Sequence, residues 1–261
     1  MEFIGFILTI IIGLLIGLFG GGGSILTVPV LVYIFFIPTS VSTTYSLALV
    51  SITSLLASFP HVLKKRLSFK KIVQFGLPSM LALYSVRSFV LPSIPSTFSV
   101  FGFLIEKDFF MMLFFAILML ISGVFMIKQK RNNPDCIDCV YNKYILIVAG
   151  FSEGFITGMV GAGGGFIIVP ILIIFGKLSI KQAVANSLFI IGVKSFIGFL
   201  VSQDLGLLDH SLLFKLIVLA LVGMFFGVQL SKKIDSVKLK PIFGFFVVIM
   251  GIVILVKEVF L

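Results

Sequence analysis

Three charged side chains lie within long apolar stretches of the sequence, where charged groups are rare and usually have a function. Lys194 is central in the stretch 183–201, too deep for its ammonium group to reach a membrane surface easily. It could bind an anionic substrate or pair with Glu153, which lies in the middle of the stretch 143–160. Glu153 in turn could carry a proton or only neutralise Lys194. Arg87 lies nearer one end of its stretch, so that it could snorkel to the surface or pair. Glu153 and Arg87 are therefore candidates for coupling or charge pairing.

Two runs of small residues, Gly20–Gly23 and residues 161–165, offer a second kind of chemistry. Glycine in a helix interior costs about 1 kcal/mol relative to alanine, so each run should break a helix. A helix that begins near Ser24 or Gly165 presents unpaired N–H groups and the positive end of its dipole, which together hold anions. The runs could instead serve close helix packing. Because they are longer than packing requires, we favour a role in lining a ligand site.

Polar residues early in two later segments could complete such a site. Ser46 and the pair Asn186-Ser187 could donate hydrogen bonds to an oxyanion, or only satisfy neighbouring backbone groups. The predicted substrate-binding residues are Gly22, Gly23, Ser24, Ser46, Gly163, Gly164, Gly165, Asn186, Ser187 and Lys194. The residues predicted to support the helix breaks are Gly20, Pro29, Gly161 and Pro170. Neither a catalytic constellation nor a metal site is predicted.

The elements that must position these residues are membrane-spanning helices. The chain has 261 residues, of which 59% are hydrophobic and 11% charged, against about 25% charged in soluble domains. Apolar segments recur along the chain at about 3–19, 24–37, 41–60, 72–92, 109–127, 143–160, 165–176, 183–201, 211–230 and 241–260. The formal net charge of +10 does not indicate nucleic-acid binding, because the basic residues lie in short loops between these segments.

The two halves of the sequence repeat each other. A shift of 141 residues places Gly13 on Gly154 and Pro29 on Pro170, and the identities cluster on glycine, proline and serine. Chance matches in apolar sequence would fall mostly on Leu, Ile and Phe. The last helix pair aligns only at a smaller shift, so we expect 92–108 to be an inserted loop. Other glycine pairs spaced four apart, such as Gly223 and Gly227, are typical of helix-packing seams.

Loop charges predict that the second half is inverted in the membrane. Each half is expected to contain a helix hairpin broken at glycine, which returns the chain to its starting side, and three further spanning helices. Because three is an odd number of crossings, the second half would begin on the opposite side of the membrane. The basic loops 61–71, 128–143, 177–181 and 231–240 then share the cytoplasmic side, and the acidic loop 202–210 faces out. Both chain termini are predicted to be extracytoplasmic. The predicted domains are a first repeat at 1–127, a cytoplasmic linker at 128–142 and a second repeat at 143–261.

The repeated glycine motif resembles that of the sulfite exporter TauE/SafE family. The two copies read GLFGGGGSILTVPVL and GMVGAGGGFIIVPIL, and each half later carries a small-polar-Ser-Leu element, TTYSL or VANSL. The resemblance implies a secondary transporter of the cytoplasmic membrane for sulfite, sulfonates or related sulfur oxyanions. The chain departs from the family pattern at Arg87, at Pro92 and Pro95, and in the inserted loop.

The sequence therefore predicts an all-α integral membrane protein with two inverted repeats. Its expected function is the export, by alternating access, of a small anion that binds between the two glycine breaks. No cofactor, enzyme activity or nucleic-acid partner is expected; the partners are the anion, the lipid bilayer and, as an open question, a second copy of the chain. Three alternatives stay open: a cation or metal permease, a thiol-handling protein that uses Cys136 and Cys139, and a passive channel.

Overall fold

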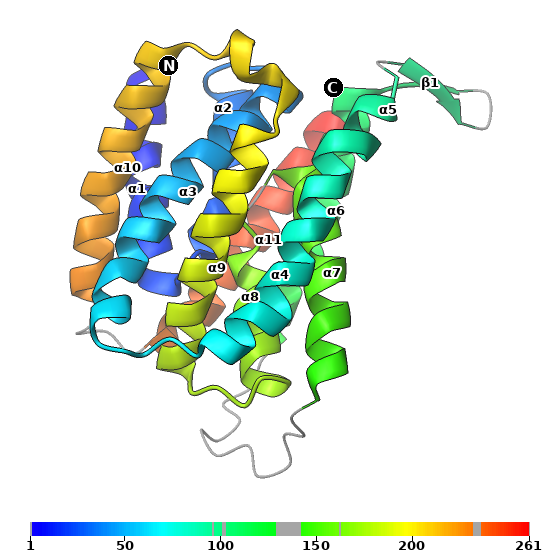
Figure 1. Ribbon diagram of the computed structural model, residues 1–261. Helices are drawn as coiled ribbons and strands as arrows, with labels where there is room; N and C mark the ends of the chain where they lie inside the picture. The colour runs from blue at the N-terminus through cyan, green and yellow to red at the C-terminus, as the bar shows by residue number, and fades with distance from the viewer. Residues whose placement is uncertain are drawn as a thin grey trace.

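The computed structural model describes residues 2–95, 97–100, 103–128, 142–161, 163–231 and 236–260. Within them the chain forms a bundle of long helices (Figure 1). The helices of the first half are α1 (Glu2–Phe19), α2 (Thr27–Tyr33), α3 (Thr39–Leu63), α4 (Phe69–Ser85) and α6 (Lys107–Lys128). Those of the second half are α7 (Lys143–Val160), α8 (Gly165–Ile174), α9 (Ile180–Leu200), α10 (His210–Leu230) and α11 (Ser236–Phe260). Each predicted apolar segment thus contains one helix, as expected.

Shorter elements join the helices. They are the 3₁₀ turns η1 (Gly22–Leu26) and η3 (Gln203–Leu207), the π-helical turn η2 (Val86–Val90), and α5 (Leu91–Ser93). The expectation of an all-helical architecture is confirmed, with one addition that the sequence did not predict: the inserted loop 92–108 contains an antiparallel hairpin of β1 (Thr97–Val100) and β2 (Phe103–Glu106). Thr, Phe, Val and Ile in this stretch favour strand, and the stretch lies between helices at one end of the bundle (Figure 1).

Five helices in the described part of the chain are long and apolar enough to cross a membrane. They are α3, α6, α7, α9 and α10, with α1 and the η1–α2 stretch as shorter apolar helices. Large apolar side chains such as Phe151, Phe225 and Ile121 point outward and are more than half exposed. An apolar outer surface of this extent is expected where lipid, rather than water, surrounds the bundle.

The helices α3 and α9 pack against each other at the centre of the bundle. Many of the buried small and hydroxyl side chains of the protein lie on these two helices. Three further pairs pack most extensively around them: α1 with α10, α4 with α7, and α6 with α11. Small residues allow these close approaches. A Cβ on Gly13 would overlap the Ala220 backbone, and a Cβ on Gly223 would overlap that of Ile10. The prediction of glycine packing seams is confirmed.

The chain ends and several loops segregate to the two ends of the bundle (Figure 1). The start of α1 and the end of α11 lie at one end, together with η3 and the β-hairpin, whereas loops 64–68 and 175–179 lie at the other. The helices α1 and α7 begin at opposite ends. The predicted thiols Cys136 and Cys139 and most of the linker 128–142 lie outside the described residues.

Candidate functional site

The first glycine break occurs where predicted and reverses the chain between α1 and α2. Gly20 and Gly21 have φ angles of 70° and 97°, a left-handed conformation that residues with a Cβ adopt at a cost. A 3₁₀ turn begins at Gly22, and its Ser24 hydroxyl donates to the Gly21 carbonyl at 2.7 Å. The regular helix therefore starts only at Thr27, later than the sequence indicated.

The second break has the same local cause. Gly161 ends α7 with a φ of 70°, and Gly164 precedes α8 with a φ of 78°. The helix α8 begins at Gly165, as predicted, and the N–H groups of Ile167 and Ile168 bond to the Gly164 carbonyl. Pro170 lies inside α8 as Pro29 lies inside α2.

The two breaks, far apart in sequence, touch each other in the core. A Cβ on Gly165 would stand 2.5 Å from the carbonyl carbon of Gly21, and one on Gly163 would stand 3.0 Å from Ser24 Oγ. Only glycine permits this backbone contact. Six of the predicted substrate-binding residues thereby gather in one region: Gly22, Gly23, Ser24, Gly163, Gly164 and Gly165. In this conformation the backbones at Gly21 and Gly165 are packed together and leave no room between them.

A fully buried ion pair lies beside the second break. Lys194 donates to Glu153 Oε1, and both side chains have no solvent exposure. Lys194 Nζ also donates to Thr157 Oγ1 at 3.0 Å, and Ser79 Oγ donates to Glu153 Oε2 at 2.6 Å. Because a buried ion is stable only when it is paired and hydrogen-bonded, these contacts explain how two charges persist in an apolar core. The sequence left open whether Lys194 binds an anionic substrate or pairs with Glu153; in this structure it pairs with Glu153.

The predicted polar residues of α3 and α9 differ in their hydrogen-bond partners. Ser187 Oγ donates to the Gly20 carbonyl at 3.0 Å, so it joins α9 to the first break. Asn186 instead binds backbone, since its amide donates to the Gln182 carbonyl and accepts from the Ser68 N–H. Ser46 Oγ is buried without a hydrogen-bond partner. The same is true of the Thr27, Ser54 and Ser195 hydroxyls, so several unpaired donors lie in the core.

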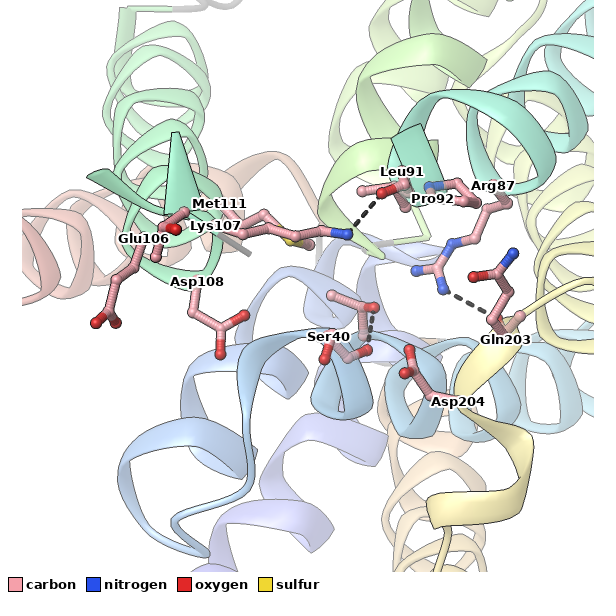
Figure 2. A pocket seen from close by; sticks show the side chains of 13 residues that line it. Ser40, Arg87, Leu91, Pro92, Glu106, Lys107, Asp108, Met111, Gln203 and Asp204 are labelled. Atoms are coloured by element: carbon pink, nitrogen blue, oxygen red, sulfur yellow. Dashed lines mark hydrogen bonds between the residues drawn. The ribbon is translucent and has the colours of Figure 1, made fainter. Parts of the chain in front are cut away.

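Arg87 lies in the π-helical turn that ends α4. Pro92 follows, and its ring would crowd the Ser88 carbonyl in a regular α-helix, which is a local reason for the wider turn. Arg87 does not snorkel, because it is only 4% exposed. Its Nη1 donates to Ser202 Oγ at 2.9 Å and reaches Thr44 Oγ1 at 3.5 Å. The side chain lines a cavity of about 430 Å³ near η3 and the start of α6 (Figure 2).

Sequence reasoning missed the partners of these charges. Ser79, Thr157, Ser202 and Asp204 are ordinary polar residues in sequence, and only their neighbours in space give them a role. The acidic loop 202–210, which contains Ser202 and Asp204, is the sequence feature that could have indicated partners for Arg87; by itself it predicts only the orientation in the membrane.

The chain also matches known proteins. The profile described as "Sulfite exporter TauE/SafE" matches residues 5–254. The chain belongs to the sulfite exporter TauE/SafE family. A probable membrane transporter protein of Xylella fastidiosa is 27% identical over 255 residues, covering 94% of this chain and 91% of the relative. A probable membrane transporter protein of Methanocaldococcus jannaschii is 27% identical over 261 residues, covering 94% and 92%. A Bacillus subtilis protein of the same description, YdhB, is 24% identical over 236 residues, covering 88% and 90%.

No solved structure matches the chain significantly. Membership of TauE/SafE makes the protein a multi-pass membrane transporter, and not an enzyme. The resemblance read from the doubled glycine motif is confirmed.

Proposed function

We propose that this TauE/SafE protein is a secondary transporter that exports a small anion, namely sulfite, a sulfonate or a related sulfur oxyanion, by alternating access. The class of transporter comes from the family, and the family description names sulfite. A negative-inside potential favours outward movement of an anion by about 2.3 kcal/mol per charge per 100 mV. An anion that crosses without a proton is therefore driven outward by the membrane potential, whereas a monoanion that crosses with one proton carries no net charge and follows its own gradient and the pH gradient.

The observation that carries this proposal is the contact between the two glycine breaks beside a buried cation. Gly21 meets Gly165, and Gly164 packs against the carboxylate that holds Lys194. When the two breaks separate, their backbone N–H groups and the start of α8 would face one another across a gap. Such groups bind oxyanions without carrying charge themselves. The anion would then lie between the breaks, with the Ser46 hydroxyl free to donate to it.

Glu153 provides a means of coupling. A proton on Glu153 would remove the charge that neutralises Lys194, so that the ammonium could attract the anion instead. One proton and one anion would then occupy the core together, which keeps the buried charge balanced. Glu153 accepts from Ser79 as well, so the protonated carboxyl keeps a hydrogen-bond partner.

We also propose that the two halves are inverted repeats that rock against each other. Gly13 packs on Ala220 as Gly154 packs on Ser79, and Gly20 packs on Val184 as Gly161 packs on Thr43. Each pair of contacts is related by the 141-residue shift between the halves: Gly13 corresponds to Gly154 and Ala220 to Ser79. In the same way, Gly20 corresponds to Gly161 and Val184 to Thr43. The opposite directions of α1 and α7 in Figure 1 support inversion. Such repeats are a frequent transporter design.

Loop charge supports the proposed orientation. The loop 64–68 carries Lys64, Lys65 and Arg66, and lies at the end opposite η3. Asp204 and Asp209 lie at the η3 end, where the chain termini also lie. By the positive-inside rule the first end is cytoplasmic and the termini are extracytoplasmic.

The test is radiolabelled sulfite uptake into proteoliposomes under an imposed potential and pH gradient. We expect saturable uptake that excess unlabelled sulfite and some of the competitors sulfate, thiosulfate, taurine and chloride reduce. Dependence on the pH gradient should disappear in Glu153→Gln if that residue carries the coupled proton. Folded protein that moves none of these anions would refute the carrier proposal.

The leading alternative is a cation permease. It would need carboxylates free to bind the ion, but the deeply buried Glu153 is already neutralised by Lys194. This pairing favours the anion. Accumulation of a divalent cation in the same vesicles, without anion flux, would reverse the choice.

A further inference from the structure

Arg87 keeps one edge of its guanidinium group without a partner. Nη1 is held by the hydroxyls of Ser202 and Thr44, whereas Nε and Nη2 have no hydrogen-bond partner although the side chain is buried. Nε–H and Nη2–H point in the same direction from the planar group. They therefore form the two-pronged edge that binds two oxygens of a carboxylate or sulfonate at once. A buried cation with such an edge unpaired is costly unless a ligand occupies it.

The Arg87 side chain lines a cavity whose size and lining suit a small anion. Figure 2 shows the Arg87 side chain directed into the space between Lys107, Asp108 and Asp204. At about 430 Å³ the cavity falls within the usual range for small organic ligands, roughly 300–1,000 Å³, and is large for an inorganic oxyanion alone. Leu91, Pro92 and Met111 supply an apolar part of the wall.

The other charges around the cavity limit the charge of the ligand. Lys107 is engaged with the Leu91 carbonyl at 2.6 Å, and Asp108 lies in the first turn of α6, where the helix dipole stabilises a carboxylate. Asp204 is close enough to Arg87 to interact with its charge, yet forms no ion pair with it in the described chain. Glu106 lines the cavity as well, and three carboxylates near one unpaired cationic edge repel a dianion more than a monoanion.

We propose that this cavity is a second anion site, in which Arg87 binds the sulfonate or carboxylate of a small organic monoanion and the apolar wall holds its carbon chain. The site lies at the η3 end of the bundle and adjoins the second glycine break through Thr43, which lines the cavity and also packs on Gly161. The wide helical turn that carries Arg87 is a rare conformation that recurs at functional sites. Identifying the ligand as the transported solute rests on the proposed function, whereas the site itself rests on Arg87 and the cavity.

The test measures ethanesulfonate and sulfate binding to the full-length, detergent-purified protein by isothermal titration calorimetry at constant ionic strength. We expect ethanesulfonate to bind more tightly than sulfate. Arg87→Lys keeps the charge but loses the paired donors, and should weaken ethanesulfonate binding at least tenfold. Arg66→Gln removes an exposed arginine from the opposite end and is the matched control, with unchanged binding. Asp204→Asn should raise sulfate affinity more than ethanesulfonate affinity, a gain that misfolding cannot imitate.

The site is refuted if folded wild-type protein binds no ethanesulfonate, if Arg87→Lys binds it as tightly as wild type, or if Asp204→Asn leaves the preference unchanged. Wild-type protein that transports sulfite without binding ethanesulfonate would refute this site and leave the proposed function standing. If the wild-type protein binds ethanesulfonate, Arg87→Lys abolishes that binding and the wild type transports no anion, the site stands and the proposed function is refuted.

Discussion

At the scale of single residues, a charged side chain is stable in the core only when it has an ion-pair or hydrogen-bond partner. The sequence placed Lys194 and Glu153 deep in apolar stretches and left two roles open for each. The structure pairs them across 41 residues of sequence, with Thr157 and Ser79 satisfying further hydrogen-bonding groups. Removal of one member would strand a buried charge, whereas replacement of both would leave none. This difference separates a structural role from a transport role.

We predict that Lys194→Met and Glu153→Gln each destabilise the protein, by about 3–5 kcal/mol, the usual cost of breaking a buried ion pair. The double variant should recover most of that stability. It should nevertheless fail to transport sulfite, because no cation remains to attract the anion. Thermal unfolding in detergent and proteoliposome uptake measure the two effects. A double variant that transports normally would show that the pair serves stability alone.

At the scale of elements, each glycine break is set by local backbone conformation but also fixes contacts with residues distant in sequence. Gly164 takes a left-handed φ that the start of α8 requires, and it also faces Glu153 and Thr157. The first condition could be expected from the glycine run, since conformational freedom is a property of the residue itself. The second could not, because it depends on how α7 and α8 fold back on each other.

We predict that Gly164→Ala lowers stability and abolishes sulfite transport. The left-handed backbone costs an L-residue about 1–2 kcal/mol, and the added methyl group would overlap the Glu153 carboxylate and displace it from Lys194. Gly206→Ala is the matched control, since a Cβ there meets nothing within 4 Å. Unfolding temperature and uptake should be unchanged in the control. Equal behaviour of the two variants would argue against a tight requirement at the break.

At the scale of the whole molecule, basic and acidic loops occupy opposite ends of one bundle (Figure 1). The helix pairs α1–α10 and α4–α7 flank the central pair α3–α9, and their glycine contacts correspond between the halves. The proposed alternating access would need only that one half tilt against the other about the contact at Gly21 and Gly165. The proposed orientation in the membrane rests on loop charge.

We predict that the η3 end faces outward. In a background with Cys136 and Cys139 replaced by serine, a membrane-impermeant thiol reagent should label Leu207→Cys in intact cells. It should label Arg66→Cys only after the membrane is permeabilised. Both positions are exposed, at opposite ends of the bundle, so each serves as the control for the other. The opposite labelling pattern would overturn the proposed orientation while leaving the fold intact.

The sequence by itself determined the apolar segments, both glycine breaks and the family, because run length, backbone freedom and motif order are local properties of the chain. It did not predict the β1–β2 hairpin within the inserted loop, and it left Arg87 undecided between the surface and a partner. Only the tertiary structure decided that Gly21 meets Gly165, that Lys194 pairs with Glu153, and that Arg87 lines a cavity with two guanidinium nitrogens unpaired. These contacts join segments far apart in the chain, and they depend on how each helix is rotated and packed, which no spacing along a single segment specifies.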